Sequence, residues 1–350
     1  MKIKKLLLVM PILFSFAAYA GDCTTEFENK NYEKALIECT QEAEKGSSEA
    51  QYLLGDLYFD ATTGVEQDEA LYQKAIYWFT KSAEQGYVDA QYALGELYHK
   101  SDSELQDYQK ALFWYEKAVE QNDPSSQHNL AIMYEYGNGV EQNIQKALTL
   151  YIKSAEQGYI DAQYALGVMY DQGDGIEQDK QKAIFWYEKA AEQDDFNSQF
   201  NLALMYDEGD GVEQNKQKAA FWYTKLAERN VVPEAQYKLG IMYDKGDGIE
   251  QDKQKAVFWY EKAAEQNNFN AQYNLALMYD EGDGVEQNKQ KAAFWFTKAA
   301  VLDVSSVEYK LGIMYDKGDG VEQNKLLANR YFKQSCERGF DKACNKLKNN

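Results

Sequence analysis

Apolar residues recur along the chain with the spacing of amphipathic α-helices. One apolar stripe contains Ala162, Leu166, Met169 and Tyr170, which fall within about 100° of one another at 3.6 residues per turn. A second stripe contains Ala183, Trp186, Tyr187, Ala190 and Ala191. Between the two stripes, Gly173-Asp174-Gly175 is typical of a helix end followed by a turn. The pattern therefore predicts a helical hairpin whose two stripes face a core.

This hairpin pattern is present eight times. The motif Ala-Gln-Tyr-x-Leu-Gly begins at Ala50, Ala90, Ala162 and Ala235, and variants of it begin at Ser126, Ser198, Ala271 and Val307. Five of the seven intervals between starts are 36 residues, and the others are 40 and 37. One hairpin cannot bury both of its stripes, so neighbouring repeats must stack on one another. We therefore expect an all-α protein, an α/α solenoid of stacked helix hairpins, with 21–49 as an N-terminal capping hairpin, 50–342 as the eight repeats and 343–350 as a C-terminal cap.

The first twenty residues have the pattern of a secretory signal. Lys2, Lys4 and Lys5 precede the apolar run at 6–16, and Ala18-Tyr19-Ala20 supplies a small-residue cleavage site. The apolar run is shorter than the roughly 20 residues that a membrane-spanning helix needs. We expect cleavage after Ala20 and a periplasmic or secreted mature protein without membrane insertion.

Composition narrows the classes of partner. The chain has 37 Lys and Arg against 57 Asp and Glu, a net charge of −20, and we take the acids to be spread evenly along it. Such a charge argues against nucleic acid as the partner. The 28 Tyr, 16 Phe and 6 Trp indicate a folded chain, and the three Pro favour helices.

Motifs for catalysis or metal binding are missing from the sequence. It has no Gly-x-x-x-x-Gly-Lys-Ser/Thr loop, no His-Glu-x-x-His and no Gly-x-Ser-x-Gly. The two histidines, His99 and His128, are expected to be ordinary packing or surface residues. The Asp171 to Glu177 segment fails as a calcium loop because Gly173 and Gly175 fall where oxygen ligands are needed. We predict a non-enzymatic protein without a cofactor or a metal.

One side of each first helix is not needed for the predicted core. In the fourth repeat it carries Tyr164, Val168 and Asp171 at i, i+4 and i+7, and similar lines recur in the other repeats. The candidate partner-binding residues on these lines are Tyr52, Tyr92, His128, Tyr164, Phe200, Tyr237, Tyr273, Tyr309, Asp171, Asp207, Asp244, Asp280 and Asp316. Either each aromatic packs on its neighbour in the adjacent repeat and the acids are merely solvated, or the lines hold a basic or amphipathic polypeptide.

Segments such as AQYALGVMYDQGDGIEQDKQKAIFWYEKAAEQ resemble Sel-one-like repeats, which are relatives of the tetratricopeptide repeat. The resemblance covers residues 31–345. It implies a right-handed superhelix whose first helices line a concave groove, and a monomeric adaptor or scaffold that binds a protein or peptide there. A cell-wall or glycan-binding module is the alternative. Some cysteine-rich relatives bind or weakly hydrolyse β-lactams, but this chain lacks the Ser-x-x-Lys and Lys-Thr-Gly motifs.

The four cysteines, Cys23, Cys39, Cys336 and Cys344, allow three disulfide connectivities. Two cysteines lie near each end of the chain, which favours the pairs Cys23–Cys39 and Cys336–Cys344. The i, i+8 spacing of the second pair also resembles the disulfide clasp of cysteine-rich Sel-one-like proteins. Four free thiols are the alternative; a zinc site is disfavoured because no Cys-x-x-Cys pair is present.

Overall fold

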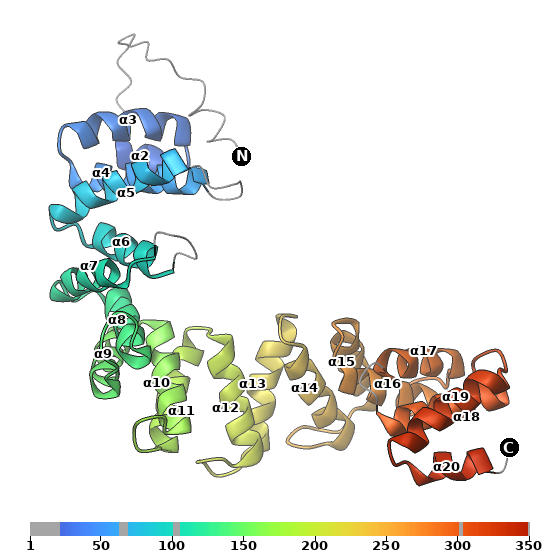
Figure 1. Ribbon diagram of the computed structural model, residues 1–350. Helices are drawn as coiled ribbons and strands as arrows, with labels where there is room; N and C mark the ends of the chain where they lie inside the picture. The colour runs from blue at the N-terminus through green and yellow to red at the C-terminus, as the bar shows by residue number, and fades with distance from the viewer. Residues whose placement is uncertain (1–21, 63–68, 101–105, 301–303, 349–350) are drawn as a thin grey trace. The chain divides into compact units, whose positions relative to one another are not determined.

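The chain is all-helical wherever its structure is described. The computed structural model describes residues 22–62, 69–100, 106–300 and 304–348, in which there are 19 α-helices and no strand (Figure 1). The expected signal segment and its cleavage site lie outside these residues. The helices are α2 (Cys23–Glu28), α3 (Tyr32–Glu44), α4 (Ser48–Thr62), α5 (Glu69–Glu84), α6 (Val88–Lys100), α7 (Tyr108–Glu120), α8 (Pro124–Tyr136), α9 (Ile144–Glu156), α10 (Ile160–Gln172), α11 (Lys180–Glu192), α12 (Phe196–Glu208), α13 (Lys216–Glu228), α14 (Pro233–Lys245), α15 (Lys253–Glu265), α16 (Phe269–Glu281), α17 (Lys289–Ala299), α18 (Ser305–Lys317), α19 (Lys325–Glu337) and α20 (Asp341–Lys348).

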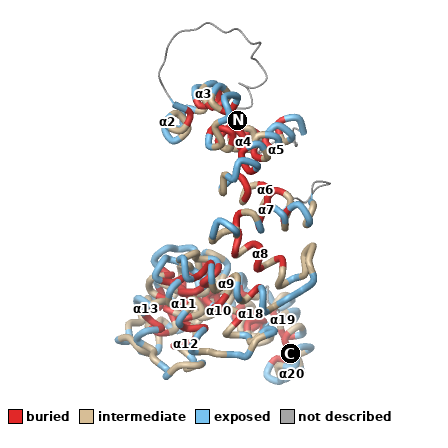
Figure 2. Tube along the Cα trace, turned by 90° about the vertical axis from the view of Figure 1, so that its left-hand side faces the viewer, coloured by how far each residue is buried: buried red, intermediate tan, exposed pale blue. Residues whose placement is uncertain are grey.

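The helices form two compact units that divide between residues 178 and 179. The first unit contains α2 to α10, and the second contains α11 to α20. Within each unit, helices that follow one another pack together as hairpins, such as α6 with α7 and α14 with α15. Buried residues lie on the sides of the helices that face their neighbours, and exposed residues lie outside (Figure 2). The predicted stacked-hairpin solenoid fold is confirmed.

The turn inside each hairpin is built from a few polar contacts. In the sixth repeat α14 ends at Gly246, which has φ 72°, a left-handed conformation that favours glycine. The Gln251 side chain then donates a hydrogen bond of 2.8 Å to the backbone carbonyl of Asp244. The Asp252 carboxylate caps α15 by accepting from the backbone N–H of Lys255 at 3.0 Å. The Gly-Asp-Gly turn predicted from the sequence therefore ends the first helix, and side-chain hydrogen bonds to the backbone hold it in place.

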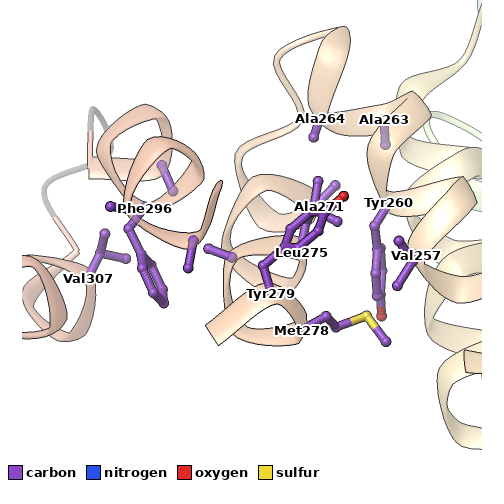
Figure 3. Close-up of a cluster of buried hydrophobic side chains, with 14 of the residues drawn as sticks. Val257, Tyr260, Ala263, Ala264, Ala271, Leu275, Met278, Tyr279, Phe296 and Val307 are labelled. Atoms are coloured by element: carbon purple, nitrogen blue, oxygen red, sulfur yellow. The ribbon is translucent and has the colours of Figure 1, made fainter. Parts of the chain in front are cut away.

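Small residues let one large ring fill each hairpin. Tyr260 of α15 is fully buried against α14 and α16, beside Met278 in the core cluster (Figure 3). A Cβ on Gly240 would lie 2.6 Å from the Tyr260 ring, so this ring could not keep its present position with a larger residue there. Ala263 and Ala271 are likewise fully buried.

The predicted stripes are correct at most positions. Ala162, Leu166 and Met169 are buried, whereas Tyr170 is only half-buried. Trp186 was expected in the core and is also half-buried. It lies at the outer edge of α11, where its ring meets the exposed ring of Phe185 edge-on at 4.9 Å.

Successive repeats are joined by buried amide groups. The Gln266 side chain donates to the Gln236 side chain of the same repeat at 2.8 Å, and Gln236 donates to the Ala227 carbonyl of the preceding repeat at 3.2 Å. In the last repeat these two glutamines are replaced by Arg338 and Glu308, which form an ion pair at 2.6 Å. The Glu308 residue is 3% exposed, so this joint carries buried charge.

Both predicted disulfides are present. Cys23 of α2 is bonded to Cys39 of α3, with Cα atoms 4.5 Å apart. Cys336 of α19 is bonded to Cys344 of α20, with Cα atoms 4.8 Å apart. Each bond fastens a short terminal helix to the hairpin next to it. Disulfides in proteins indicate an oxidising environment outside the cytoplasm.

Candidate functional site

The candidate residues lie on the first helix of each repeat, and we call these residues together the groove line. The aromatic members, from Tyr52 to Tyr309, are all half-buried. The acidic members from Asp171 to Asp316 lie near the helix ends, and only Asp316 is buried. The groove line is therefore a partly covered surface rather than a fully solvated one.

The aromatic residues of the groove line pack on rings of their own repeat. Tyr237 contacts Tyr260 with ring centroids 6.0 Å apart, and Tyr273 contacts Phe296 at 6.0 Å. The same pairing joins Tyr52 to Phe79, Tyr92 to Tyr115, His128 to Tyr151, Phe200 to Tyr223 and Tyr309 to Phe332. Three of these rings also contact the last residue of their own repeat: Tyr52 contacts Tyr87, His128 contacts Tyr159 and Tyr309 contacts Phe340. One side of these rings is thus structural, and because the rings are only half-buried, part of each remains exposed.

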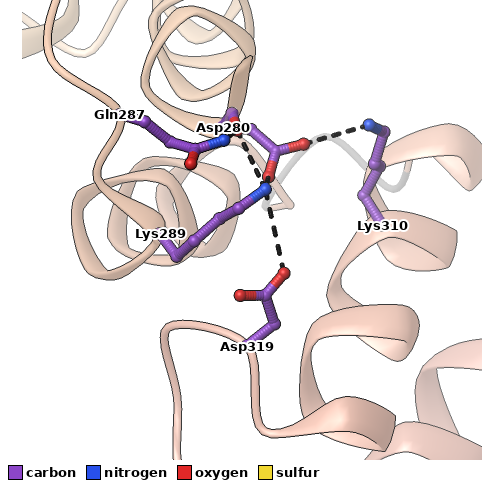
Figure 4. Close-up of polar contacts among 5 residues, drawn as sticks. All are labelled: Asp280, Gln287, Lys289, Lys310 and Asp319. Atoms are coloured by element: carbon purple, nitrogen blue, oxygen red, sulfur yellow. Dashed lines mark hydrogen bonds and ion pairs between the residues drawn. The ribbon is translucent and has the colours of Figure 1, made fainter. Parts of the chain in front are cut away.

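In the second unit the acids of the groove line are paired with lysines. Lys289, the first residue of α17, binds Asp280 of its own repeat at 2.6 Å and Asp319 of the next repeat at 3.8 Å (Figure 4). Asp280 also binds Lys310 of the next repeat at 3.2 Å. Equivalent own-repeat pairs join Asp207 to Lys216, Asp244 to Lys253 and Asp316 to Lys325. These acids are therefore not merely solvated, because they form part of a charge ladder between repeats.

In the Asp280–Lys289 pair the pKa values of both partners are shifted. Burial alone would raise the pKa of Asp280, but hydrogen bonds from Lys289 and Lys310 outweigh it and lower the pKa. The hydrogen bond to Asp280 raises the pKa of Lys289. Both groups therefore remain charged over a wide pH range, and the acidic row of the second unit is neutralised from within.

The first unit lacks this lysine. Its second helices α5, α7 and α9 have Tyr72, Tyr108 and Ile144 at the position of Lys289. The charge of the two units differs accordingly: residues 22–178 contain ten Lys and Arg against 29 Asp and Glu, and residues 179–350 contain 24 against 28. The acids are thus not spread evenly along the chain, contrary to expectation, and the excess negative charge belongs to the first unit.

Two side chains on the first helices of the first unit, Asp56 and His128, have strongly shifted pKa values. Burial, together with the charge of Asp60, raises the pKa of Asp56 to about 6. Burial lowers the pKa of His128 to about 4, because its ring lies against Tyr151 and Tyr159. The Tyr151 hydroxyl donates to Glu135 at 2.6 Å. His128 is therefore a packing residue in its neutral form.

A hollow of about 360 Å³ opens on the groove line of the second unit. Tyr237, Ile241 and Asp244 of α14 and Asn274 and Leu277 of α16 line its sides, and Tyr260 of α15 lies among them. The buried Tyr260 hydroxyl interacts with the Asn274 and Asp244 side chains at the wall of the hollow. The hollow therefore combines apolar side chains with polar groups that can orient a partner.

Two further negative observations apply to the described residues only. Nowhere in them do three His, Cys, Asp or Glu side chains come together in a way that would hold a metal ion. In the same ranges no helix has the length and apolar character needed to cross a membrane.

Sequence analysis missed the lysine ladder, although a signal for it exists. Each ladder lysine follows the N-cap Asp or Asn of its helix and lies nine residues after the groove-line aspartate, as Lys253 does after Asp244. The first three repeats have no lysine at this position, and they lie in the unit that carries the excess negative charge.

Comparison with known proteins identifies what the chain resembles. A family model described as Sel1 repeat matches residues 48–87, 88–123, 124–159, 160–195, 197–231, 233–268, 270–302 and 305–340. A protective antigen present in uropathogenic Escherichia coli strains, which displays an SLR fold, is 37% identical with a TM-score of 0.80, over 89% of this chain and 66% of that protein. A Sel1 repeat protein from Oxalobacter formigenes is 31% identical with a TM-score of 0.65, over 98% of both chains. No match was found among curated proteins.

Proposed function

The chain belongs to the Sel1 repeat family, and on that premise we propose that it is an exported, non-catalytic scaffold that holds a protein or peptide along its groove line. Sel1 repeat proteins mediate protein interactions. We place this interaction on the first helices of the repeats because the groove line lies there.

The observation that carries the proposal is the hollow between α14 and α16. It combines apolar side chains, Ile241 and Leu277, with the polar side chains of Asp244 and Asn274. Peptide-binding surfaces typically join apolar anchors to a few polar groups that fix the main chain. An apolar side chain of the partner would fill the hollow, while a backbone N–H of the partner donates to the Asp244 carboxylate and a carbonyl accepts from the Asn274 amide.

The preference for a basic partner belongs to the first unit in this proposal. Residues 22–178 contain 29 Asp and Glu against ten Lys and Arg, and no lysine ladder neutralises this excess of negative charge. Long-range attraction of this kind raises the association rate more than it raises the final affinity. A basic, amphipathic polypeptide would thus be attracted by the first unit, and its apolar residues would be bound by hollows such as the one in the second.

Export completes the proposal. The apolar segment at 6–16 and the cleavage site after Ala20 would direct the chain to the periplasm or the outside of the cell. The two disulfides fit such a destination. The Escherichia coli relative is described as a protective antigen, which is consistent with a place outside the cytoplasm.

A displayed library of random 16-residue peptides tests the groove directly. We expect selection on the wild-type protein to enrich peptides with spaced apolar residues and an excess of Lys and Arg. Ile241→Asp with Leu277→Asp should abolish their binding, and Leu326→Asp on α19, where the side chain is 84% exposed outside the groove line, should leave it unchanged. The proposal is wrong if enriched peptides bind the groove variant and the wild type equally well.

A further inference from the structure

The second helices of the second unit expose one phenylalanine in each of four consecutive repeats. We call Phe185, Phe221, Phe258 and Phe294, from α11, α13, α15 and α17, the outer row. They are 50%, 61%, 48% and 53% exposed. Single exposed apolar side chains are common on protein surfaces, so it is the recurrence of the ring at the same position in successive repeats that needs a reason.

The fold does not require these rings. The equivalent position is Thr149 in α9 and Arg330 in α19, and both of these residues are exposed in hairpins of the same design. Tyr77 occupies the position in α5, and Phe113 occupies it in α7 of the first unit, where it is 50% exposed. A threonine, an arginine or a tyrosine therefore serves the hairpin as well as phenylalanine does, and the repeated phenylalanine needs another reason.

Each ring of the outer row has a defined setting. The tryptophan that follows it meets it edge-on at 4.9 to 5.0 Å, which fixes the direction of the ring. A lysine precedes each ring by three residues and another follows it by four, as Lys255 and Lys262 do for Phe258. The ammonium groups of Lys189, Lys262 and Lys298 lie 5.8 to 6.0 Å from the ring centroids of Phe185, Phe258 and Phe294.

An apolar hollow adjoins the last of these rings. It has a volume of about 320 Å³ and is lined by Phe294, Ala293, Thr297 and Lys298 of α17 together with Val321 of the next repeat. The subsite therefore offers one ring face, an apolar recess and a cation within a few ångströms of each other.

From these observations we propose that the outer row is a set of subsites for an acidic polysaccharide. A pyranose ring has an apolar C–H face that stacks on an aromatic ring, and the carboxylate of an acidic sugar pairs with lysine. The lysine that follows a ring supplies this charge, as Lys262 and Lys298 do beside Phe258 and Phe294. The preceding lysine is bonded elsewhere, as Lys255 is to Asp252 and Lys291 to the Tyr279 hydroxyl. The near balance of charge in residues 179–350, 24 cations against 28 anions, allows a polyanion to approach.

The repetition favours a polysaccharide over a folded protein. Four subsites with the same ring, the same tryptophan and the same lysines follow one another at intervals of 36 or 37 residues. A polymer of identical sugars presents the same group to each subsite, whereas a folded protein presents a different group to each. Linked weak contacts of this kind gain affinity together.

The test measures binding of polygalacturonate to the full-length mature protein by isothermal titration calorimetry. The variant replaces all four rings by threonine (Phe185→Thr, Phe221→Thr, Phe258→Thr and Phe294→Thr), and the matched control replaces the same four by tyrosine. Both residues occur naturally at this position, so both variants should fold, which circular dichroism checks. We expect the threonine variant to bind at least about tenfold more weakly and the tyrosine variant to bind like the wild type.

Two further polymers identify the occupant. Fully methyl-esterified polygalacturonate keeps the sugar rings without the charge, and poly-L-glutamate keeps the charge without the rings. Both should bind more weakly than polygalacturonate, and the threonine substitutions should not affect poly-L-glutamate. Equal binding of polygalacturonate to the threonine variant and the wild type overturns the proposal. So does a loss of poly-L-glutamate binding as large as that of polygalacturonate, which would assign the row to an acidic polypeptide, and so does undiminished binding of the methyl ester.

Discussion

Replacing Lys289 with methionine tests the charge ladder between repeats. The Lys289 ammonium contacts the Asp280 carboxylate at 2.6 Å, the Asp280 backbone carbonyl at 2.9 Å and Asp319 of the next repeat at 3.8 Å. Methionine has nearly the same length and keeps the apolar packing of the stem. The substitution therefore removes the charge and its hydrogen bonds with little change in volume.

The structure sets the size of the effect. The Asp280 side chain is 14% exposed and the Lys289 side chain 33%, so the pair lies between a buried and a surface ion pair. A hydrogen bond to a charged group contributes about 1.5–3 kcal/mol, and partial exposure of the ammonium reduces this figure. We expect Lys289→Met to lower the free energy of unfolding by about 1–2 kcal/mol.

Urea unfolding followed by circular dichroism gives the measurement, and Lys333→Met is the matched control. Lys333 faces Glu337 at 3.8 Å on the open surface of α19, with side chains 70% and 62% exposed, so its loss should change stability by less than about 0.5 kcal/mol. Equal unfolding midpoints for the two variants would refute the ladder as a source of stability.

The Asp280–Lys289 pair also predicts how the difference in free energy of unfolding between the wild type and Lys289→Met depends on pH. Asp280 has a lowered pKa in the fold, so its contribution is present above pH 3.8 and disappears as the pH falls through the folded value. Lys289 has a raised pKa, so its contribution is complete below pH 10.5 and disappears as the pH rises through its folded value. A difference that stays constant outside this window would contradict the assignment to an ion pair.

Three further predictions concern the clasps, the last joint and the first repeat. Cys336→Ala with Cys344→Ala should destabilise the end of the chain by about 2.5 kcal/mol in the chain-entropy account, seen as faster amide hydrogen exchange in α20 while α14 is unaffected. Glu308→Gln should lower the free energy of unfolding by about 2 kcal/mol, because Arg338 loses its buried counter-charge. Adding Arg338→Gln should recover part of this loss in a double-mutant cycle, because it recreates the pair of Gln236 and Gln266. Asp56→Asn should stabilise the protein at pH 7 and not at pH 3.5, because its raised pKa of about 6 means that the charged form is the unfavourable one in the fold. Unfolding midpoints at the two pH values measure this, and an equal effect at both would exclude it.

The architecture could be predicted because it depends on local patterns in the sequence. The 36-residue period, the glycine turns after residues such as Gln172 and Lys245, and the alanine-rich stripes each specify a hairpin without reference to the rest of the chain. The disulfides followed from the position of two cysteines at each end. Trp186 was placed wrongly because a helical stripe gives the direction of a side chain and not the depth of the neighbour that covers it.

The candidate site could be located by helix face but not described by contact. The groove-line aromatics were easy to find, yet nothing in the spacing shows that Tyr273 packs on Phe296 of its own second helix. The pairing of Asp280 with both Lys289 and Lys310 depends on how closely two repeats approach, which is a tertiary distance. The exposure of Phe294 likewise depends on what covers α17, which no single helix reveals.

Hydrogen exchange of the protein saturated with a peptide selected from the displayed library tests the central claim most directly. The account predicts slower exchange in the first helices, above all in α14 and α16 around the hollow lined by Ile241 and Leu277, with little change in α13 and α15. Protection confined to the second helices, or protection in α14 and α16 that persists at the same peptide concentration in Ile241→Asp with Leu277→Asp, would contradict it.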